Sequence, residues 1–439
     1  MLEFGTDGVR GRANLELTVE FALKFGQSVA KAMSGSTFVV GRDTRISGTM
    51  LQAAFSAGLA SMGASVLDVG VLPSPGVGYI CSRLRLPGAV ISASHNPYFD
   101  NGIKVIGPSG SKLSDDTEAE IEKYVGETLD LSPVVGIMNE ASHLTKDYLD
   151  FLTSLPGVRR LDGMKIVLDV GHGAASTIAR QVFEAYGATV VVINDTPDGT
   201  NINSKAGSTY LAGLTAVVID EGANLGLAFD GDADRVLGVD EVGNSIDGDV
   251  IMAILAKDLM QKGQLRHNSM AVTVMSNLGL KRAMQEVGIK VFETLVGDRY
   301  VFEAMERYDI VLGGEQSGHV ILRDLATTGD GMLTGLFFAS ALCSKQAPTS
   351  AIVKATMVRY PQVLTNVSFV GDSKVILSSP VVESAIESAK DELGDNGRVL
   401  VRASGTEPLI RVMVEAMNND VAQRLANNIC DEIKHAATL

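Results

Sequence analysis

Hydrophobic and polar positions along the chain repeat one arrangement three times, in which a helical pattern ends at a glycine and a strand pattern follows. The glycines open residues 63–67, 187–191 and 288–292, and each precedes a short run rich in β-branched residues. Helices commonly end at glycine, and a short apolar, β-branched run is typical of a strand. Each repeat is therefore predicted to contain a helix that leads into a strand.

Further strand patterns lie on both sides of these junctions. They precede the helix at residues 37–40, 165–168 and 271–275, and they follow the second strand at residues 88–92, 225–229 and 309–312. The order strand, helix, strand, connection, strand is typical of α/β units with a mostly parallel sheet. Apolar runs such as Ile166, Val167 and Leu168 fit strands that are buried on both faces of such a sheet.

The repeats and the length of 439 residues predict several domains. We expect three related α/β domains with mostly parallel mixed sheets at residues 1–145, 146–245 and 246–350, because domains typically contain about 100 to 150 residues. Alternations such as Val399-Leu400-Val401 predict a C-terminal α+β domain at residues 355–439. We expect the four domains to surround a central cleft. One large doubly wound domain is the alternative.

Composition and charge narrow the classes of function. Apolar residues make up 46% of the chain and charged residues 20%, with 46 glycines, which is typical of a folded protein with many tight turns. The formal net charge of −15 argues against a nucleic-acid partner, because nonspecific nucleic-acid binding depends on clustered lysine and arginine. An anionic substrate would therefore have to meet a local cluster of cations.

The sequence lacks the features that mark exported or membrane-spanning chains. Its first residues contain neither the basic segment nor the apolar segment of a signal peptide, and no apolar run approaches about 18 residues. We therefore expect a cytoplasmic protein with no membrane partner. A Gly-x-Gly-x-x-Gly motif does not open the first α/β unit, which argues against a dinucleotide-dependent enzyme.

The first candidate site residues follow the third strand of the first repeat. Ligands of open α/β sheets bind beyond the carboxyl ends of the strands. Here Ser94 and His95 precede an Asn-Pro turn, and Lys104 follows closely. A serine that accepts a phosphoryl group needs a neighbouring proton carrier and positive charge, so Ser94 is predicted to be a nucleophile. The alternative is a turn serine that only bonds the local backbone.

The corresponding loop of the second repeat carries carboxylates at every second position. Asp230, Asp232 and Asp234 directly follow a buried apolar run, and Arg235 comes next. In an extended segment alternate side chains share a face, so the three carboxylates are expected to converge as oxygen ligands for Mg²⁺. Manganese is the second choice, and calcium fits less well because the loop lacks the EF-hand pattern. A solvated acidic turn is the alternative.

The loop of the third repeat is polar and rich in glycine. Gly313 and Gly314 would let the backbone approach a ligand, while Glu315, Ser317 and His319 can pair with hydroxyl groups. This combination suggests a sugar-binding loop. On its own it is also compatible with an ordinary polar turn.

Anion-binding chemistry gathers in the C-terminal segment. Arg402, Ser404, Gly405, Thr406 and Arg411 combine two planar guanidinium groups, two hydroxyls and a glycine turn, which suits a phosphate group. An ordinary surface turn is the alternative.

More arginines lie next to glycines near the start of the chain. They are Arg10, Arg42 and Arg45, and we expect them to face the same cleft as the other candidate site residues.

Taken together, these segments resemble the α-D-phosphohexomutase family along the whole chain and in the expected order. The segments that carry the resemblance most clearly are residues 92–104, 313–319 and 327–331. The resemblance implies that Ser94 is a phosphoserine. It also implies one Mg²⁺ held by Asp230, Asp232 and Asp234, with the phosphate on Ser94 as a further ligand.

The resemblance assigns roles to the remaining candidates. The reaction centre would be lined by Arg10, His95, Lys104 and Arg235. Lys104 would carry the proton of the attacking sugar hydroxyl, with His95 and Arg10 as electrostatic support. Sugar hydroxyls would be held by Glu315 and Ser317, with His319 nearby. The distal phosphate would be held by Arg402, Ser404, Gly405, Thr406 and Arg411.

A mutase of this family passes a phosphoryl group through a hexose 1,6-bisphosphate, which also serves as primer. Gln316 and residues 327–331 favour a hexosamine phosphate, namely glucosamine phosphate, as the substrate. Glucose and mannose phosphates are the alternatives, and a homodimer is compatible with this interpretation. The rival classes are a metal-dependent sugar phosphatase, which would release inorganic phosphate, and a noncatalytic sugar-phosphate binder, which would need no reactive serine.

Overall fold

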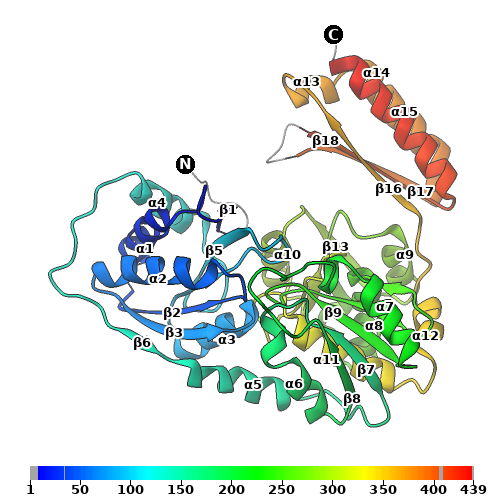
Figure 1. The fold of residues 1–439 in the computed structure, drawn as a ribbon. Helices are drawn as coiled ribbons and strands as arrows, with labels where there is room; N and C mark the ends of the chain where they lie inside the picture. Colours follow the sequence, from blue (N-terminus) through cyan, green and yellow to red (C-terminus); the bar gives the residue numbers. More distant parts are fainter. Residues whose placement is uncertain (1–7, 34, 405–408, 438–439) are drawn as a thin grey trace. The chain divides into compact units, whose positions relative to one another are not determined.

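The computed structural model describes residues 8–33, 35–404 and 409–437 (Figure 1). The chain forms two compact units. The first comprises Met1–Met275 and Ile289–Thr356, and the second comprises Ser276–Gly288 and Met357–Leu439. Three sheets belong to the first unit and one to the second, so each unit is described separately below.

The N-terminal sheet has six strands in the order β1-β5-β4-β2-β3-β6. Its strands are β1 (Val9–Arg12), β2 (Thr37–Arg42), β3 (Ser65–Val71), β4 (Gly88–Ile91), β5 (Asp100–Ile106) and β6 (Met138–Glu140). The accompanying helices are α1 (Val19–Met33), α2 (Gly48–Ser61), α3 (Ser74–Leu84) and α4 (Asp115–Val125).

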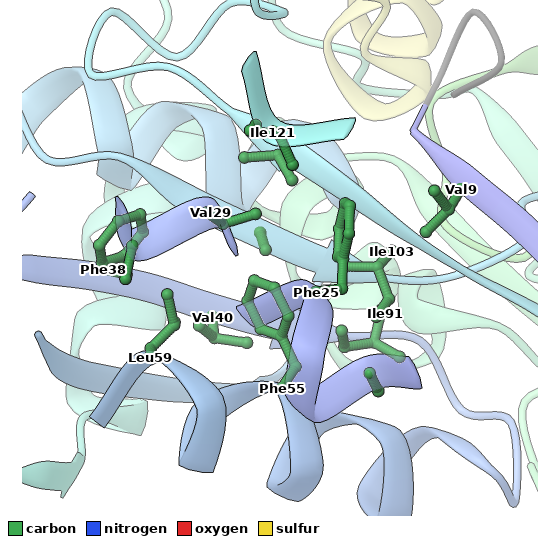
Figure 2. Packing of buried hydrophobic residues seen from close by; sticks show 14 of the residues in the cluster. Val9, Phe25, Val29, Phe38, Val40, Phe55, Leu59, Ile91, Ile103 and Ile121 are labelled. Atoms are coloured by element: carbon green, nitrogen blue, oxygen red, sulfur yellow. The ribbon is translucent and has the colours of Figure 1, made fainter. Parts of the chain in front are cut away.

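Large apolar side chains join α1 and α2 to this sheet. Phe25 of α1 and Phe55 of α2 lie with their ring centroids 6.0 Å apart, and both are fully buried. Figure 2 shows them in one apolar cluster that also contains Phe38 of β2 and Ile91 of β4. Burial of such side chains is the main source of stability in a core of this kind.

The second sheet has the order β11-β10-β9-β7-β8. Its strands are β7 (Lys165–Asp169), β8 (Thr189–Ile193), β9 (Leu225–Phe229), β10 (Val236–Asp240) and β11 (Ser245–Ile246). Its helices are α6 (Ala179–Ala185) and α7 (Ala212–Asp220), and α5 (Thr145–Thr153) lies between the first and second sheets in the sequence.

The third sheet has the order β13-β12-β14-β15. Its strands are β12 (Ser269–Thr273), β13 (Lys290–Thr294), β14 (Leu312–Gly314) and β15 (Val320–Leu322). The helices in this part of the first unit are α8 (Gly248–Gln261), α10 (Asp298–Arg307), α11 (Gly331–Cys343) and α12 (Thr349–Thr356). Helix α11 is almost entirely buried, as its apolar sequence requires.

One strand order recurs in all three sheets. The first strand of each repeat (β2, β7, β12) is central, and it pairs in parallel with the second and the third strand. The third strand then pairs antiparallel with the strand that follows it. The predicted triplication and the α/β class with mixed sheets are therefore confirmed. The three candidate loops connect β4 to β5, β9 to β10 and β14 to β15.

The second unit is an antiparallel sheet covered by helices, which confirms the predicted α+β class of the C-terminal segment. The sheet has the order β16-β18-β17, with strands β16 (Gln362–Ser368), β17 (Gly397–Ala403) and β18 (Leu409–Ala416). The helices are α13 (Ser373–Leu377), α14 (Pro380–Leu393) and α15 (Asn419–Ala437). Helix α15 packs on β16 and β18 and against α14 (Figure 1).

Helix α9 (Leu278–Glu286) belongs to this second unit although it lies within the third repeat of the sequence. The buried carboxylate of Glu415 accepts a hydrogen bond from the backbone of Leu278 and pairs with Arg398 at 2.5 Å. A buried carboxylate needs such partners, so this contact fixes the start of α9 to the C-terminal sheet.

Two strand predictions in the third repeat differ from the structure at their ends. The strand predicted at residues 271–275 begins at Ser269 and ends at Thr273, and the strand predicted at residues 309–312 begins only at Leu312. Asp309 has a left-handed backbone, with a φ of 51°, which no strand can accommodate. Among the residues that the structure describes, no helix is both long enough and apolar enough to span a lipid bilayer.

Candidate active site

Three aspartates converge in the loop between β9 and β10. Asp230, Asp232 and Asp234 are all buried, and one carboxylate oxygen from each lies within 4.8 Å of the others. The predicted convergence is confirmed, but the predicted extended backbone is wrong. Residues 231–234 form a turn in which Ala233 has a φ of 56°. This left-handed residue, rather than strand alternation, brings the three side chains together.

The carboxylate oxygens of this triad fit a bound cation. Oδ1 of Asp232 and Oδ1 of Asp234 are buried and accept no hydrogen bond from the described part of the chain. Burial, together with the charges of Asp234 and Asp232, holds the pKa of Asp230 well above its usual range. Converging carboxylate oxygens are the ligands that Mg²⁺ prefers. The donor set therefore suits a divalent cation of this type.

Ser94 lies directly against this triad. Its Oγ donates a hydrogen bond of 2.6 Å to Oδ2 of Asp230 and lies 3.3 Å from Nδ1 of His95. The side chain is buried, and the backbone is left-handed, with a φ of 51°. Such a conformation is uncommon for serine, and surrounding contacts must hold it in place.

A closed set of hydrogen bonds holds the backbone of Ser94. Its N–H donates to Oγ of Ser92 at 2.9 Å, and Ser92 donates to the carboxylate of Asp43 at 2.7 Å. Asp43 pairs with Arg45 at 2.8 Å, and Arg45 donates to the carbonyl oxygen of Ser94, also at 2.8 Å. All four residues are buried. The network fixes Ser94 in its strained conformation.

The network also corrects the expectation for Arg45. Arg45 is only 2% exposed, and it supports the Ser94 loop by donating hydrogen bonds to carbonyl oxygens of that loop. Arg42 donates to Gln52 of α2 at 2.8 Å. The prediction that Arg45 faces the cleft is wrong, because its guanidinium is engaged by buried groups of its own domain, whereas that for Arg42 stays a prediction.

Asn203 is a site residue that the sequence analysis missed. Its side-chain amide donates to the carbonyl oxygens of Ser94, at 2.9 Å, and Asn96, at 3.0 Å. The residue has a φ of 57°, a conformation that asparagine tolerates better than most residues. The asparagine-rich stretch around residue 201 was a weak signal for such a loop, but it gave no indication of the partner.

Ser74 is a second missed residue. It begins α3 and donates to Asp232 through Oγ, at 2.5 Å, while its backbone N–H donates to the carbonyl oxygen of Asp232 at 2.9 Å. These two bonds fix the orientation of Asp232, which is a candidate metal ligand. The residue lies far from the aspartates in sequence, in a stretch without a recognisable motif.

Two cations lie beside the aspartates. Nζ of Lys104, on β5, lies 2.8 Å from Oδ2 of Asp232 and 3.4 Å from Oδ2 of Asp234. Arg235 lies 3.8 Å from Asp234, and the surrounding carboxylates raise its pKa although burial opposes this. Both side chains form ion pairs with the acidic cluster. They can therefore help to neutralise a phosphoryl group at Ser94.

His95 is held in its neutral form. Burial, with the charges of Arg235 and Arg10, lowers its pKa to about 4. Arg10 lies on β1, opposite Gly102 of β5. A neutral imidazole close to Oγ of Ser94 can accept a proton, which a protonated one cannot.

The third loop contributes Glu315 and Ser317. Oγ of Ser317 donates to Glu315 at 3.2 Å, and both side chains are half-buried. Our expectation for Gly313 and Gly314 was wrong, because both lie within β14. A Cβ on Gly314 would lie 2.4 Å from the carbonyl oxygen of His319, so this glycine permits close strand pairing rather than ligand approach.

His319 joins the third loop to the three aspartates. Its Nδ1 lies 3.8 Å from Oδ2 of Asp234, and its Nε2 lies 2.9 Å from the backbone N of Gly329, which donates to the neutral ring. Nε2 also lies 3.3 Å from Oδ2 of Asp298. The ring is thus fixed between a backbone donor and two carboxylates.

The second unit holds the arginine pair that we predicted for phosphate. Arg402 and Arg411 are direct cross-strand partners on β17 and β18, so their side chains leave the same face. Burial and the charge of Arg411 lower the pKa of Arg402. Two adjacent like charges are stabilised by an anion between them. Ser404 follows β17, whereas Gly405 and Thr406 lie outside the described residues.

Four domain profiles of one family together match most of the chain. The alpha/beta/alpha domains I, II and III of the phosphoglucomutase/phosphomannomutase family match residues 1–132, 146–243 and 247–360. The C-terminal domain of the same family matches residues 364–432.

Curated relatives match over nearly their full length. A phosphoglucosamine mutase of Mycolicibacterium paratuberculosis is 48% identical over 442 residues, which covers 99% of both chains. A phosphoglucosamine mutase of Carboxydothermus hydrogenoformans is 48% identical over 443 residues, which covers 98% of both chains.

Solved structures share the fold at lower sequence identity. A phosphoglucomutase/phosphomannomutase family protein of Burkholderia thailandensis is 23% identical with a TM-score of 0.83, covering 98% of this chain and 97% of that one. The N-acetylphosphoglucosamine mutase of Aspergillus fumigatus, solved with GlcNAc-6P and magnesium, is 18% identical with a TM-score of 0.71, covering 100% and 96%. By sequence and by fold, the chain belongs to the phosphoglucomutase/phosphomannomutase family.

Proposed function

We propose that the chain is a phosphoglucosamine mutase, which interconverts glucosamine 6-phosphate and glucosamine 1-phosphate. The observation that carries the proposal is the 2.6 Å hydrogen bond between Oγ of Ser94 and the buried Asp230, within a triad of aspartates. A reactive hydroxyl on a cation site is the arrangement that phosphoryl transfer requires. The choice of sugar is supported by the name of the relatives that are 48% identical over the whole chain.

Asp230, Asp232 and Asp234 would hold one Mg²⁺, with a phosphoryl oxygen on Ser94 as a further ligand. When bound, the ion neutralises charge on the phosphoryl group during its transfer. The chain adds Lys104 and Arg235 to the same task, and both lie next to these carboxylates.

In the first transfer, the free hydroxyl oxygen of the sugar forms a bond to phosphorus while the bond from phosphorus to Oγ of Ser94 breaks. The products are glucosamine 1,6-bisphosphate and unmodified Ser94, and the proton of the sugar hydroxyl ends on Oγ. After the bisphosphate turns over, the reverse transfer of its other phosphoryl group restores phosphorylated Ser94. A hexose 1,6-bisphosphate would prime unphosphorylated protein in the same way.

Lys104 would carry the proton at the sugar hydroxyl, and its short contacts with Asp232 and Asp234 keep it beside the transferred group. His95 would support the transfer as a neutral ring 3.3 Å from Oγ of Ser94. Arg10 would add positive charge from β1.

Two groups of residues would bind the substrate. Glu315 and Ser317, with His319 nearby, would hold the sugar hydroxyls. The distal phosphate would be held by Arg402, Ser404, Gly405, Thr406 and Arg411. The paired arginines support this assignment because an anion relieves the repulsion between their charges.

An isomerisation assay tests the proposal. The rates with glucosamine, glucose and mannose 6-phosphates would be compared in the presence of Mg²⁺ and a catalytic amount of hexose 1,6-bisphosphate. The variants would be Ser94→Ala and, as a control, the exposed serine change Ser82→Ala. We expect glucosamine 6-phosphate to react fastest and Ser94→Ala alone to abolish the reaction. A preference for glucose or mannose phosphate would refute the assigned sugar, and an active Ser94→Ala variant would refute the mechanism.

A further inference from the structure

Tyr148 is fully buried and is connected to the candidate active site through two separate sets of contacts. Tyr148 lies on α5, between the first and second sheets in the sequence, and its hydroxyl donates to Oδ2 of Asp330 at 2.8 Å. Its ring packs with the aromatic rings of Tyr79 on α3 and Phe151 on α5. The residue therefore connects α5 and α3 with the turn that precedes α11.

Asp330 holds the turn that precedes α11. Its Oδ1 accepts from the backbone N–H of Leu333 at 3.0 Å and so caps the helix, while Oδ2 is bound by Tyr148. Both carboxylate oxygens are thus used, and the side chain is 1% exposed. A capping side chain held at both oxygens leaves the turn little freedom.

The two neighbours of Asp330 contact the proposed site directly. The N–H of Gly329 donates to Nε2 of His319 at 2.9 Å, and the N–H of Gly331 donates to the carbonyl oxygen of Ala233 at 3.0 Å. The packing is close, because a Cβ on Gly331 would lie 2.5 Å from the carbonyl oxygen of Arg235. A displacement of Asp330 would therefore move both His319 and the aspartate loop.

The ring of Tyr148 supports a second contact with the aspartate loop. A Cβ on Gly76 would lie 2.7 Å from this ring, so α3 rests on Tyr148 in its first turn. The same turn begins with Ser74, which bonds Asp232 through both its hydroxyl and its backbone. The ring of Tyr148 thus supports the turn that begins at Ser74, and its hydroxyl supports the turn around Asp330. Both turns form hydrogen bonds with the aspartate loop.

We propose that Tyr148 is a positioning residue for the aspartate loop and for His319, and that it acts through Asp330. Its hydroxyl ends on Asp330 rather than on a metal-binding carboxylate, so its effect is indirect. The activity assay of this proposal rests on the proposed function, whereas the contacts described above do not. Removal of the hydroxyl leaves a buried carboxylate oxygen without its donor, and the turn must shift to compensate.

The test compares two single-atom deletions in buried tyrosines. Tyr148→Phe removes the hydroxyl bound to Asp330. Tyr186→Phe is the matched control, because that hydroxyl donates to the backbone of Leu152 at 2.9 Å and accepts from Leu155 at 2.8 Å. The measurements are kcat and KM with the hexose phosphate that the wild type turns over, Mg²⁺ affinity by calorimetry without sugar, and melting temperature.

We expect Tyr148→Phe to lower kcat by about ten-fold, with KM within about two-fold, and to weaken Mg²⁺ binding several-fold. Tyr186→Phe should lower the melting temperature by a similar amount and leave kcat and Mg²⁺ affinity unchanged. Equal kcat and equal Mg²⁺ affinity in the two variants would overturn the proposal. A wild type that is inactive on glucosamine 6-phosphate would refute the proposed function. The role of Tyr148 would still be decided by the Mg²⁺ affinities, because calorimetry needs no sugar.

The second part of the test measures the coupling between Tyr148 and Asp330. Asp330→Asn keeps a cap for Leu333 and offers an N–H to the oxygen of Tyr148, so it should retain kcat within about three-fold. In an Asp330→Ala background, Tyr148→Phe should cause no further loss, because the path through Asp330 is already broken. Fully additive losses would contradict action through Asp330. If Asp330→Ala does not fold, the comparison with Tyr186→Phe decides alone.

Discussion

The side-chain amide of Asn203, in the loop that follows β8, donates a hydrogen bond of 2.9 Å to the carbonyl oxygen of Ser94. Arg45 donates to the same oxygen from the first sheet's domain at 2.8 Å. The backbone of Ser94 is therefore held by residues from two loops that lie far apart in the sequence. Both donors act on the backbone, so the hydroxyl of Ser94 stays available for chemistry.

The first prediction concerns Asn203→Asp, which keeps the size of the side chain and tolerates its left-handed backbone. The variant loses both amide donors and places a carboxylate against two carbonyl oxygens. We expect kcat to fall by about ten-fold to a hundred-fold, because the strained Ser94 loop loses a support that it needs. Steady-state kinetics, with the phosphorylation level of Ser94 from mass spectrometry, measure the effect. Asn201→Asp is the control, and equal rates in the two variants would disprove the role of Asn203.

The second prediction concerns Ser74→Ala, which removes the 2.5 Å hydrogen bond to Asp232. Hydrogen bonds that orient a metal ligand commonly change metal affinity by about ten-fold or more. We therefore expect a rise of about ten-fold in the Mg²⁺ concentration needed for half-maximal activity. Titration with Mg²⁺ measures it, with Ser82→Ala on the same helix as control. An unchanged Mg²⁺ requirement would show that the bond does not act on the metal site.

The third prediction concerns Arg411→Gln on β18. The variant removes one of two adjacent guanidinium groups, so we expect KM for the sugar phosphate to rise by about ten-fold or more. Arg424→Gln is the matched control, because Arg424 is an exposed arginine of the same unit that pairs with Glu392. If both variants bound substrate as the wild type does, the arginine pair would not be the phosphate site.

The fourth prediction concerns pH and Asp330. Burial raises the pKa of this carboxyl to about 6 in the folded protein. Between pH 4 and pH 6 the folded state thus holds a proton that the unfolded chain has released, and stability falls as the pH rises through this window. Asp330→Asn has no such proton. Its stability relative to wild type should rise by about 1 kcal/mol from pH 5 to pH 7, measured by urea unfolding. A pH-independent difference would contradict the raised pKa.

The repeated fold and the three loops could be predicted because their signals are local. Glycines at 63, 187 and 288 end helices, and the β-branched runs after them form strands. The rule that ligands bind beyond the carboxyl ends of strands then led to Ser94, Asp230 and Glu315. For these residues, short-range patterns contain the information that places them.

The remaining contacts depend on pairings that no local pattern specifies. Ser74 and Asn203 reach their partners from distant loops, and Arg45 turns away from the cleft to bind Asp43. The turn at Ala233 was also hidden, because alanine gives no indication of a left-handed backbone. Such features follow from tertiary packing, which overrides local preference.

The most direct test of the central claim is the fate of a labelled phosphoryl group on Ser94. Protein carrying a radiolabelled phosphoserine at this position would be mixed with glucosamine 6-phosphate and Mg²⁺ and quenched within a single turnover. We predict that the label moves to the C1 phosphate of glucosamine 1,6-bisphosphate and then appears in glucosamine 1-phosphate. Release of the label as inorganic phosphate, or its retention on Ser94 while isomerisation proceeds, would contradict the proposed mutase mechanism.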